Sequence, residues 1–158
     1  MKYLTLLIGA LASLSVLPEP AKAQNIRMAE VVDGLDEPWG LDFLPNGELI
    51  ITEKDGRVLL WGNGALSAVQ GAPKVSDRGQ GGLLDVTVAR DFAQTRTVWF
   101  SYSKRRQGGS GTALATAQLS QDGTRLEGLR DLFVMAPGSS GGRHFGPALS
   151  KRATEGFL

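Results

Sequence analysis

The chain has 158 residues, a formal net charge of +1 and no cysteine. The near balance of charge argues against nucleic-acid binding, because no basic stripe is available to neutralise phosphates. The one basic cluster, Lys104–Arg106, is expected to be a solvated loop rather than a binding patch. Without cysteine the chain can form neither a disulfide framework nor a thiolate metal site. Its stability must therefore come from a packed core.

The first 23 residues predict a secretory signal peptide. A basic start at Lys2 precedes an apolar run from Leu4 to Leu17, and the triplet Ala21-Lys22-Ala23 follows. This order is typical of a cleaved export signal, and the apolar run is short for a bilayer span. We expect cleavage after Ala23, which predicts a periplasmic or secreted protein with no membrane span after cleavage. The alternative interpretation is a buried N-terminal helix.

Short apolar runs separated by turn residues predict a first group of β-strands. Three runs cover residues 40–44, 49–52 and 58–61, and a weaker fourth run covers 66–69. Pro45-Asn46-Gly47 is a strong turn signal, and Asp55-Gly56 predicts a type I′ hairpin. Strands joined in sequence by tight turns form an antiparallel meander.

The same pattern begins again after residue 82, with runs at 83–88, 97–102, 112–119 and 126–134. Placing Leu41-Asp42-Phe43 over Leu84-Asp85-Val86 gives an offset of 43 residues. Four strands per repeat of this length are typical of β-propeller blades. The sequence therefore predicts an all-β fold, in which residues 26–134 form two four-stranded antiparallel blades of a β-propeller. A sandwich of similar strands without a true repeat is the alternative.

Two glycine-rich segments carry the candidate functional residues. His144, the only histidine, lies in the second of them, and imidazole can act as a general base near neutral pH. Gln80 lies in the first, within 79–82, and offers both a donor and an acceptor to a polar ligand. We expect the loops at 79–82 and 138–146 to share one face of the fold. The plainer alternatives are an exposed histidine without a role and a glutamine that faces water.

Other chemistries find little support in the sequence. The glycines lack the context of a dinucleotide site or a P-loop, and the aspartates lack the spacing of a calcium-binding EF-hand loop. No nucleophile elbow surrounds Ser139 and Ser140. Asp42 and Asp85 hold equivalent repeat positions, which favours a structural role at the start of each blade. The tryptophans are expected in the core between the blades: Trp39, Trp61 and Trp99.

The segments that carry a family likeness are Glu37–Gly47, Thr52–Arg57, Gly79–Val86, Asp91-Phe92, Ser101-Tyr102, Gly123–Leu126 and Gly142–Gly146. Taken together, they resemble the soluble quinoprotein aldose sugar dehydrogenases, a glucose/sorbosone dehydrogenase-like family that uses pyrroloquinoline quinone (PQQ). The likeness runs from about residue 26 to residue 146. Members of that family are six-bladed propellers, so the resemblance implies that this chain holds about two of six blades.

The resemblance also implies a reaction. Such enzymes oxidise the C1 hydroxyl of an aldose to a lactone, transfer hydride to the quinone, and pass electrons to an external acceptor; calcium holds the quinone. His144 matches the family's general base, and Gln80 matches a glutamine that contacts the cofactor and substrate region. Arg143 stands where some members have an aspartate.

Residues 147–158 do not continue the strand pattern. We therefore expect a signal peptide at 1–23, the N-terminal part of a propeller at 24–146 and a divergent tail at 147–158, as in a truncated or frameshifted reading frame that is inactive alone. The family's other cofactor and calcium residues lie on later blades. The alternative function is that of a non-catalytic propeller piece that binds a sugar or a protein partner, since a fold does not fix its function.

Overall fold

The computed structural model describes residues 27–146 and 149. The predicted signal peptide, its cleavage site and all of the tail except Leu149 lie outside the described residues. Residues 27–30 belong to a separate N-terminal unit, where they are exposed and have no regular secondary structure. In the part of the chain that is described, no helix has the length and apolar character needed to cross a membrane.

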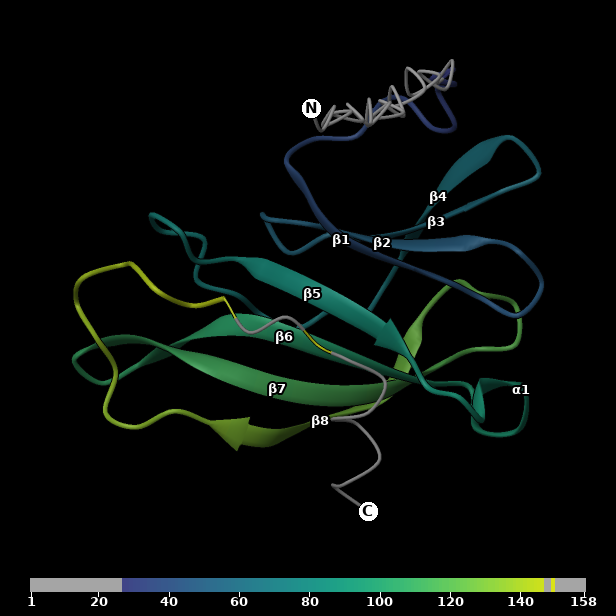
Figure 1. The fold of residues 1–158 in the computed structure, drawn as a ribbon. Coiled ribbons are helices and arrows are strands. Elements are labelled where there is room, and N and C mark those ends of the chain that lie inside the picture. The colour runs from purple at the N-terminus through teal and green to yellow at the C-terminus, as the bar shows by residue number, and fades with distance from the viewer. Residues whose placement is uncertain (1–26, 147–148, 150–158) are drawn as a thin grey trace, which may run out of the picture. The chain divides into compact units, whose positions relative to one another are not determined.

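The first sheet is an antiparallel meander of four strands in the order β1-β2-β3-β4 (Figure 1). The turn after β1 is closed by Leu44, whose N–H donates to the Glu48 carbonyl over 2.8 Å and whose carbonyl accepts from Gly47 over 2.9 Å. All four runs predicted for this region are strands in the structure. Their bounds are β1 (Pro38–Phe43), β2 (Leu49–Glu53), β3 (Val58–Gly62) and β4 (Ala65–Val69).

The prediction of a type I′ turn at Asp55-Gly56 is wrong. A type I′ turn needs positive φ at both central residues, but only Gly56 has it there, with φ of 108°. The Gly56 N–H instead donates to the Glu53 carbonyl over 3.0 Å, so that the glycine follows a tight turn. Both residues of Asn63-Gly64 have positive φ, at 52° and 75°, which places the I′-like geometry in the next hairpin, between β3 and β4.

The second sheet repeats the first in the order β5-β6-β7-β8. The strands β6 and β7 extend further than predicted, so Lys104–Arg106 ends a strand instead of forming a loop. Lys104 forms an ion pair with Asp131 on β8, while Arg105 and Arg106 are exposed. A single helical turn, α1 (Phe92–Thr95), was not predicted. The strands are β5 (Leu83–Val88), β6 (Thr97–Arg106), β7 (Gly109–Leu119) and β8 (Leu126–Val134).

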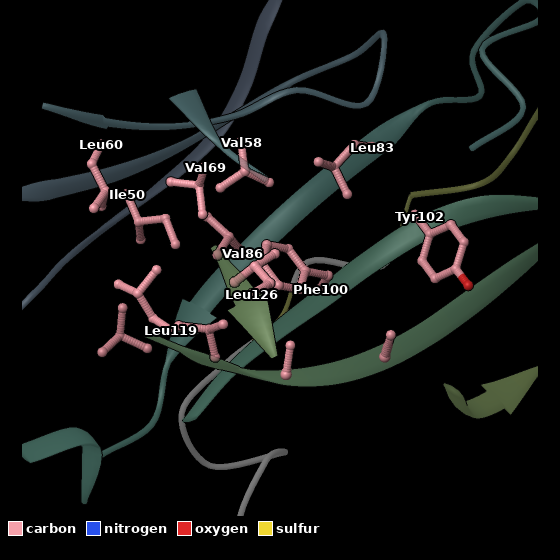
Figure 2. Packing of buried hydrophobic residues seen from close by; sticks show 14 of the residues in the cluster. Ile50, Val58, Leu60, Val69, Leu83, Val86, Phe100, Tyr102, Leu119 and Leu126 are labelled. Carbon is pink, nitrogen blue, oxygen red and sulfur yellow. The ribbon is translucent and has the colours of Figure 1, made fainter. Parts of the chain in front are cut away.

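The core lies between the two sheets. Figure 2 shows that side chains from the first sheet face side chains of the second, and the buried cluster contains members of both. These residues are aliphatic or aromatic, and burying them removes apolar surface from water, which is the main stabilising contribution. The labelled members from the two sheets are Ile50, Val58, Leu60 and Val69, then Leu83, Val86, Phe100, Tyr102, Leu119 and Leu126.

The tryptophans do not form this core, which corrects the prediction. Side chains alternate between the two faces of a strand, and Leu60 already faces the second sheet, so Trp61 lies on the opposite face, where it packs against a smaller cluster. Trp39 is 50% exposed. Trp99 is buried, but it lies between Val98 and Phe100 in sequence and belongs to neither cluster.

Polar contacts join the two sheets at the start of β1 and β5. Thr52 is fully buried, and its hydroxyl donates to the Leu84 carbonyl over 2.6 Å while accepting from the Gly40 N–H over 3.0 Å. A Cβ at Gly40 would lie 3.0 Å from the Cα of Asp85. The backbones of β1 and β5 can therefore approach this closely only because residue 40 is glycine.

Asp42 extends the connection between the sheets. Its Oδ1 accepts from the Phe43 N–H over 2.8 Å, and its Oδ2 accepts from the N–H of Val88, the last residue of β5, over 2.8 Å. Carboxylate acceptors form stronger hydrogen bonds to N–H groups than neutral acceptors do. The structure thus agrees with the structural role expected for Asp42.

The turn between β7 and β8 predicts a pH-dependent contribution to stability. Hydrogen bonds from the Ser120 hydroxyl and from Thr124 lower the pKa of Asp122 to about 2. In the unfolded chain this carboxyl would titrate near 3.9, so its stabilising effect should be complete above about pH 4 and lost as the pH falls through about 2. NMR titration of the Asp122 carboxyl measures this directly. A midpoint near 3.9 in the folded protein would contradict the prediction, and Asp122→Asn should remove this part of the acid sensitivity.

Candidate functional site

The two glycine-rich loops lie against each other at one end of the second sheet, on the left of Figure 1, as the sequence predicted. The Gln80 N–H donates to the Gly142 carbonyl over 2.9 Å. In return, the Gln80 side-chain oxygen Oε1 accepts from the His144 N–H over 3.0 Å. The two candidate residues, separated by 64 positions, are thus joined by a direct hydrogen bond.

The first loop needs glycine at its closest approach to the second. Gly79 has φ of 63°, and a Cβ there would lie 2.5 Å from the Gly142 carbonyl oxygen. The loop is also tied to β6, because the Gly82 N–H donates to the hydroxyl of buried Ser103 over 2.8 Å. Gln80 is therefore held on a fixed backbone rather than on a free loop.

The second loop rests on the hairpin that joins β6 and β7. Ser110 and Ser139 exchange two backbone hydrogen bonds, of 3.0 Å and 2.8 Å. This pairing was not predicted, because neither residue lies in a regular apolar pattern. It fixes the loop a few residues before His144.

His144 itself is exposed and has φ of 65°. A residue other than glycine in this left-handed region is uncommon, and such residues gather at functional sites. The next residue, Phe145, is only 2% exposed and anchors the segment in the protein. Within the described residues, the imidazole has no hydrogen bond or ion pair, so the ring is available to a ligand.

The geometry refines the role expected for Gln80. Its Oε1 is already used by the His144 N–H, whereas its Nε2 amide has no hydrogen-bond partner in the described part of the chain. Gln80 is also exposed. The side chain thus supports the histidine with its oxygen and presents two N–H donors to a polar ligand.

Next to this pair lies an open hollow of about 550 Å³. Arg78 lines it, and Arg143 is exposed one residue before His144. The hollow was not predicted, since it is assembled by three loops that are distant in sequence. Besides Arg78 and Gly79, it is lined by Gly108–Ser110 and Ser139–Gly142.

The site offers hydrogen-bond donors, a basic imidazole and nearby positive charge. It can therefore receive a polar or anionic organic ligand and accept a proton from it. Among residues 27–146 and 149, no group of three or more His, Cys, Asp or Glu side chains could hold a metal ion.

Comparison with known proteins identifies related sequences. The sequence model of the Glucose / Sorbosone dehydrogenase family matches residues 35–157. The match continues past Gly146, so the prediction that the likeness ends there is wrong. Aldose sugar dehydrogenase YliI of Escherichia coli K12 is 41% identical over 133 residues, which are 82% of this chain and 36% of that protein.

Solved structures give the same result. A glucose dehydrogenase crystal structure has a TM-score of 0.72 and 43% identity to this chain. The matched region is 75% of this chain and 35% of the dehydrogenase chain. The soluble aldose sugar dehydrogenase of E. coli in its apo-form has a TM-score of 0.68 and 45% identity. The matched region is 71% of this chain and 33% of that chain. The PQQ-bound aldose sugar dehydrogenase of Streptomyces coelicolor shares the fold, with a TM-score of 0.56 and 24% identity. The matched region is 66% of this chain and 32% of that chain.

The chain spans about a third of the length of these relatives. The propeller prediction is confirmed, because the structural neighbours are β-propeller dehydrogenases and the two sheets are consecutive four-stranded blades. A third of a six-bladed propeller corresponds to two blades, which is the number found here.

Proposed function

Because this chain belongs to the Glucose / Sorbosone dehydrogenase family, we propose that it carries the general base of a quinoprotein that oxidises the C1 hydroxyl of aldose sugars to lactones. The observation that supports this most is the placement of His144. An exposed imidazole is held beside Gln80 at the meeting point of two glycine-rich loops. Both residues match the positions that the family resemblance assigns to the base and to a cofactor-contacting glutamine.

The reaction needs a hydride acceptor and a proton acceptor. PQQ, when bound, would accept the hydride from C1 of the sugar. His144, with its imidazole neutral, would take the proton of the C1 hydroxyl, so that the C1–O bond becomes the carbonyl of the lactone. The Gln80 Nε2 amide would donate to an oxygen of the sugar or of the quinone and so orient the reacting atoms.

The described residues fit the quinone better than they fit calcium. Arg78 and Arg143 are exposed close to Gln80 and His144, and guanidinium groups suit the carboxylates of an anionic cofactor. For calcium, oxygen ligands from several carboxylates or carbonyls are needed, and the described residues supply no acidic group of that kind. We therefore derive no step through calcium, although the family resemblance implies it.

We also propose that the protein is exported and that its electrons pass to an external acceptor. The basic, apolar and small-residue order of residues 1–23 supports export. The mass of the mature protein from a bacterial host measures it: a product that begins at Gln24 is expected, and a cytoplasmic product that retains Met1 would contradict the proposal.

A dye-linked assay with aldoses, PQQ and calcium tests the catalytic proposal. We expect the 158-residue chain alone to show no measurable turnover, because Gln80 and His144 are exposed to water on this chain and a site open to water loses orientation and electrostatic preorganisation. A form extended to the length of its relatives should oxidise aldoses. If the extended form binds sugars without oxidising them, the catalytic proposal is wrong and the non-catalytic alternative stands.

A further inference from the structure

Asp85 makes the same pair of hydrogen bonds in the second sheet that Asp42 makes in the first. Its Oδ1 accepts from the next N–H, that of Val86, over 3.0 Å. Its Oδ2 accepts from the N–H of Leu149 over 2.6 Å. Asp42 accepts in turn from Phe43 and from Val88. Each carboxylate thus bridges its own strand and a segment far along the chain, and we call this arrangement a carboxylate latch.

The two latches hold different segments. The Asp42 latch holds the end of β5, which is already part of a sheet. The Asp85 latch holds Leu149, five residues after His144 in sequence. On the other side of His144 the chain is held by Gln80, through the His144 N–H and the Gly142 carbonyl. Asp85 therefore supplies an attachment on the C-terminal side of the histidine, beyond buried Phe145.

Asp85 is itself rigidly placed. Its N–H donates over 3.1 Å to the hydroxyl of Ser101, which is fully buried in β6. The Cα of Asp85 also packs closely against Gly40 of β1. The position of the latch is thus set by the contact between the two sheets, and the latch fixes the position of the Leu149 N–H relative to them.

We propose that Asp85 is a positioning residue for His144, which restrains the backbone of His144 through Leu149. A left-handed φ at a residue other than glycine persists only where the surroundings hold it, and His144 is exposed. Gln80 holds the His144 N–H, and buried Phe145 anchors the next residue. The Asp85 latch adds a contact at Leu149, on the C-terminal side. The catalytic meaning of this role rests on the proposed function, whereas the positioning itself does not.

The matched variants Asp85→Asn and Asp42→Asn test the proposal in the full 158-residue chain. Asparagine has one acceptor oxygen where aspartate has two, so each variant must give up one of its two hydrogen bonds. We expect Asp85→Asn to speed amide exchange of Leu149 by about tenfold. The loss of a hydrogen bond to a charged group changes an opening equilibrium by about that factor or more. The ¹⁵N order parameter of His144 should fall from about 0.85 to below about 0.6.

Asp42→Asn is the control, because it removes a hydrogen bond from the equivalent carboxylate latch of the first sheet, which holds Val88. It should speed amide exchange of Val88 and leave the order parameter of His144 unchanged. If both variants loosen His144 equally, the effect is general destabilisation and the proposal is wrong. It is equally wrong if Asp85→Asn frees Leu149 and His144 stays rigid.

A second variant covers the case in which Asp85→Asn does not fold. Leu149→Pro removes the donor N–H and leaves the acceptor and both sheets intact, so it should loosen His144 in the same way. A rigid His144 in this variant overturns the proposal. None of these measurements depends on turnover, so a failure of the proposed function and a failure of the latch remain distinguishable.

Discussion

His144→Ala, made in an extended form that oxidises aldoses, should lower kcat by about 10²–10⁴-fold, which is the usual contribution of a general base. The KM for the sugar should change little, because the proton is transferred only as the transition state forms. The limb of the pH–rate profile that reports deprotonation of the base should also disappear. Steady-state kinetics across pH measures all three effects.

Arg143→Ala is the matched control in the same loop. Arg143 is exposed and neighbours His144, so its removal tests whether any change in this loop abolishes turnover. We expect it to affect binding of an anionic ligand and to preserve the pH–rate limb. A His144→Ala enzyme that keeps its kcat within a few-fold would assign the base to another group.

The strand order of both blades could be predicted because it depends on local patterns. Apolar runs of four to eight residues separated by turn residues favour strands whatever the tertiary context. The hairpin at Asp55-Gly56 shows the limit of this reasoning. The dipeptide favours a type I′ turn, but four residues, 54–57, connect β2 to β3, and the loop length selects the turn type.

The tryptophans were misplaced for a related reason. Size and hydrophobicity predict burial, but the face on which a strand residue lies depends on its register against the partner strands. Trp61 lies opposite Leu49 and Leu66, on the face turned away from the second sheet. Nothing in the local sequence shows which face packs against which sheet.

The sequence predicted the candidate residues and the common face of their two loops, but not the contacts between them. His144 and Gln80 stood out because glycine-rich segments surround them, and their hydrogen bond joins positions that are 64 residues apart. The equivalence of Asp42 and Asp85 was visible as a repeat. Their partners were not, because Val88 and Leu149 lie 46 and 64 residues further along the chain. The contact of Asp42 with Val88 follows from the packing of one blade on the next.

Phe100→Ala should lower the free energy of unfolding by about 3–5 kcal/mol, the usual range for a buried phenylalanine. Phe100 is 0% exposed, lies in the middle of β6 and belongs to the cluster between the sheets. Its removal leaves a cavity that the neighbouring strands can fill only in part. Because a domain of this size has about 5–15 kcal/mol of stability in total, the variant should show a large fall in the urea midpoint with little change in slope.

Phe133→Ala is the control of identical chemistry, because Phe133 on β8 is 53% exposed. Its effect should stay within about 0.5 kcal/mol, as for other surface substitutions. The comparison also tests whether the two blades are one folding unit. Phe100 lies in the second sheet, yet Ile50 of the first belongs to the same cluster. Amide protection at Ile50 and at Val98 should therefore fall together in Phe100→Ala, and a loss confined to Val98 would show that the cluster does not couple the sheets.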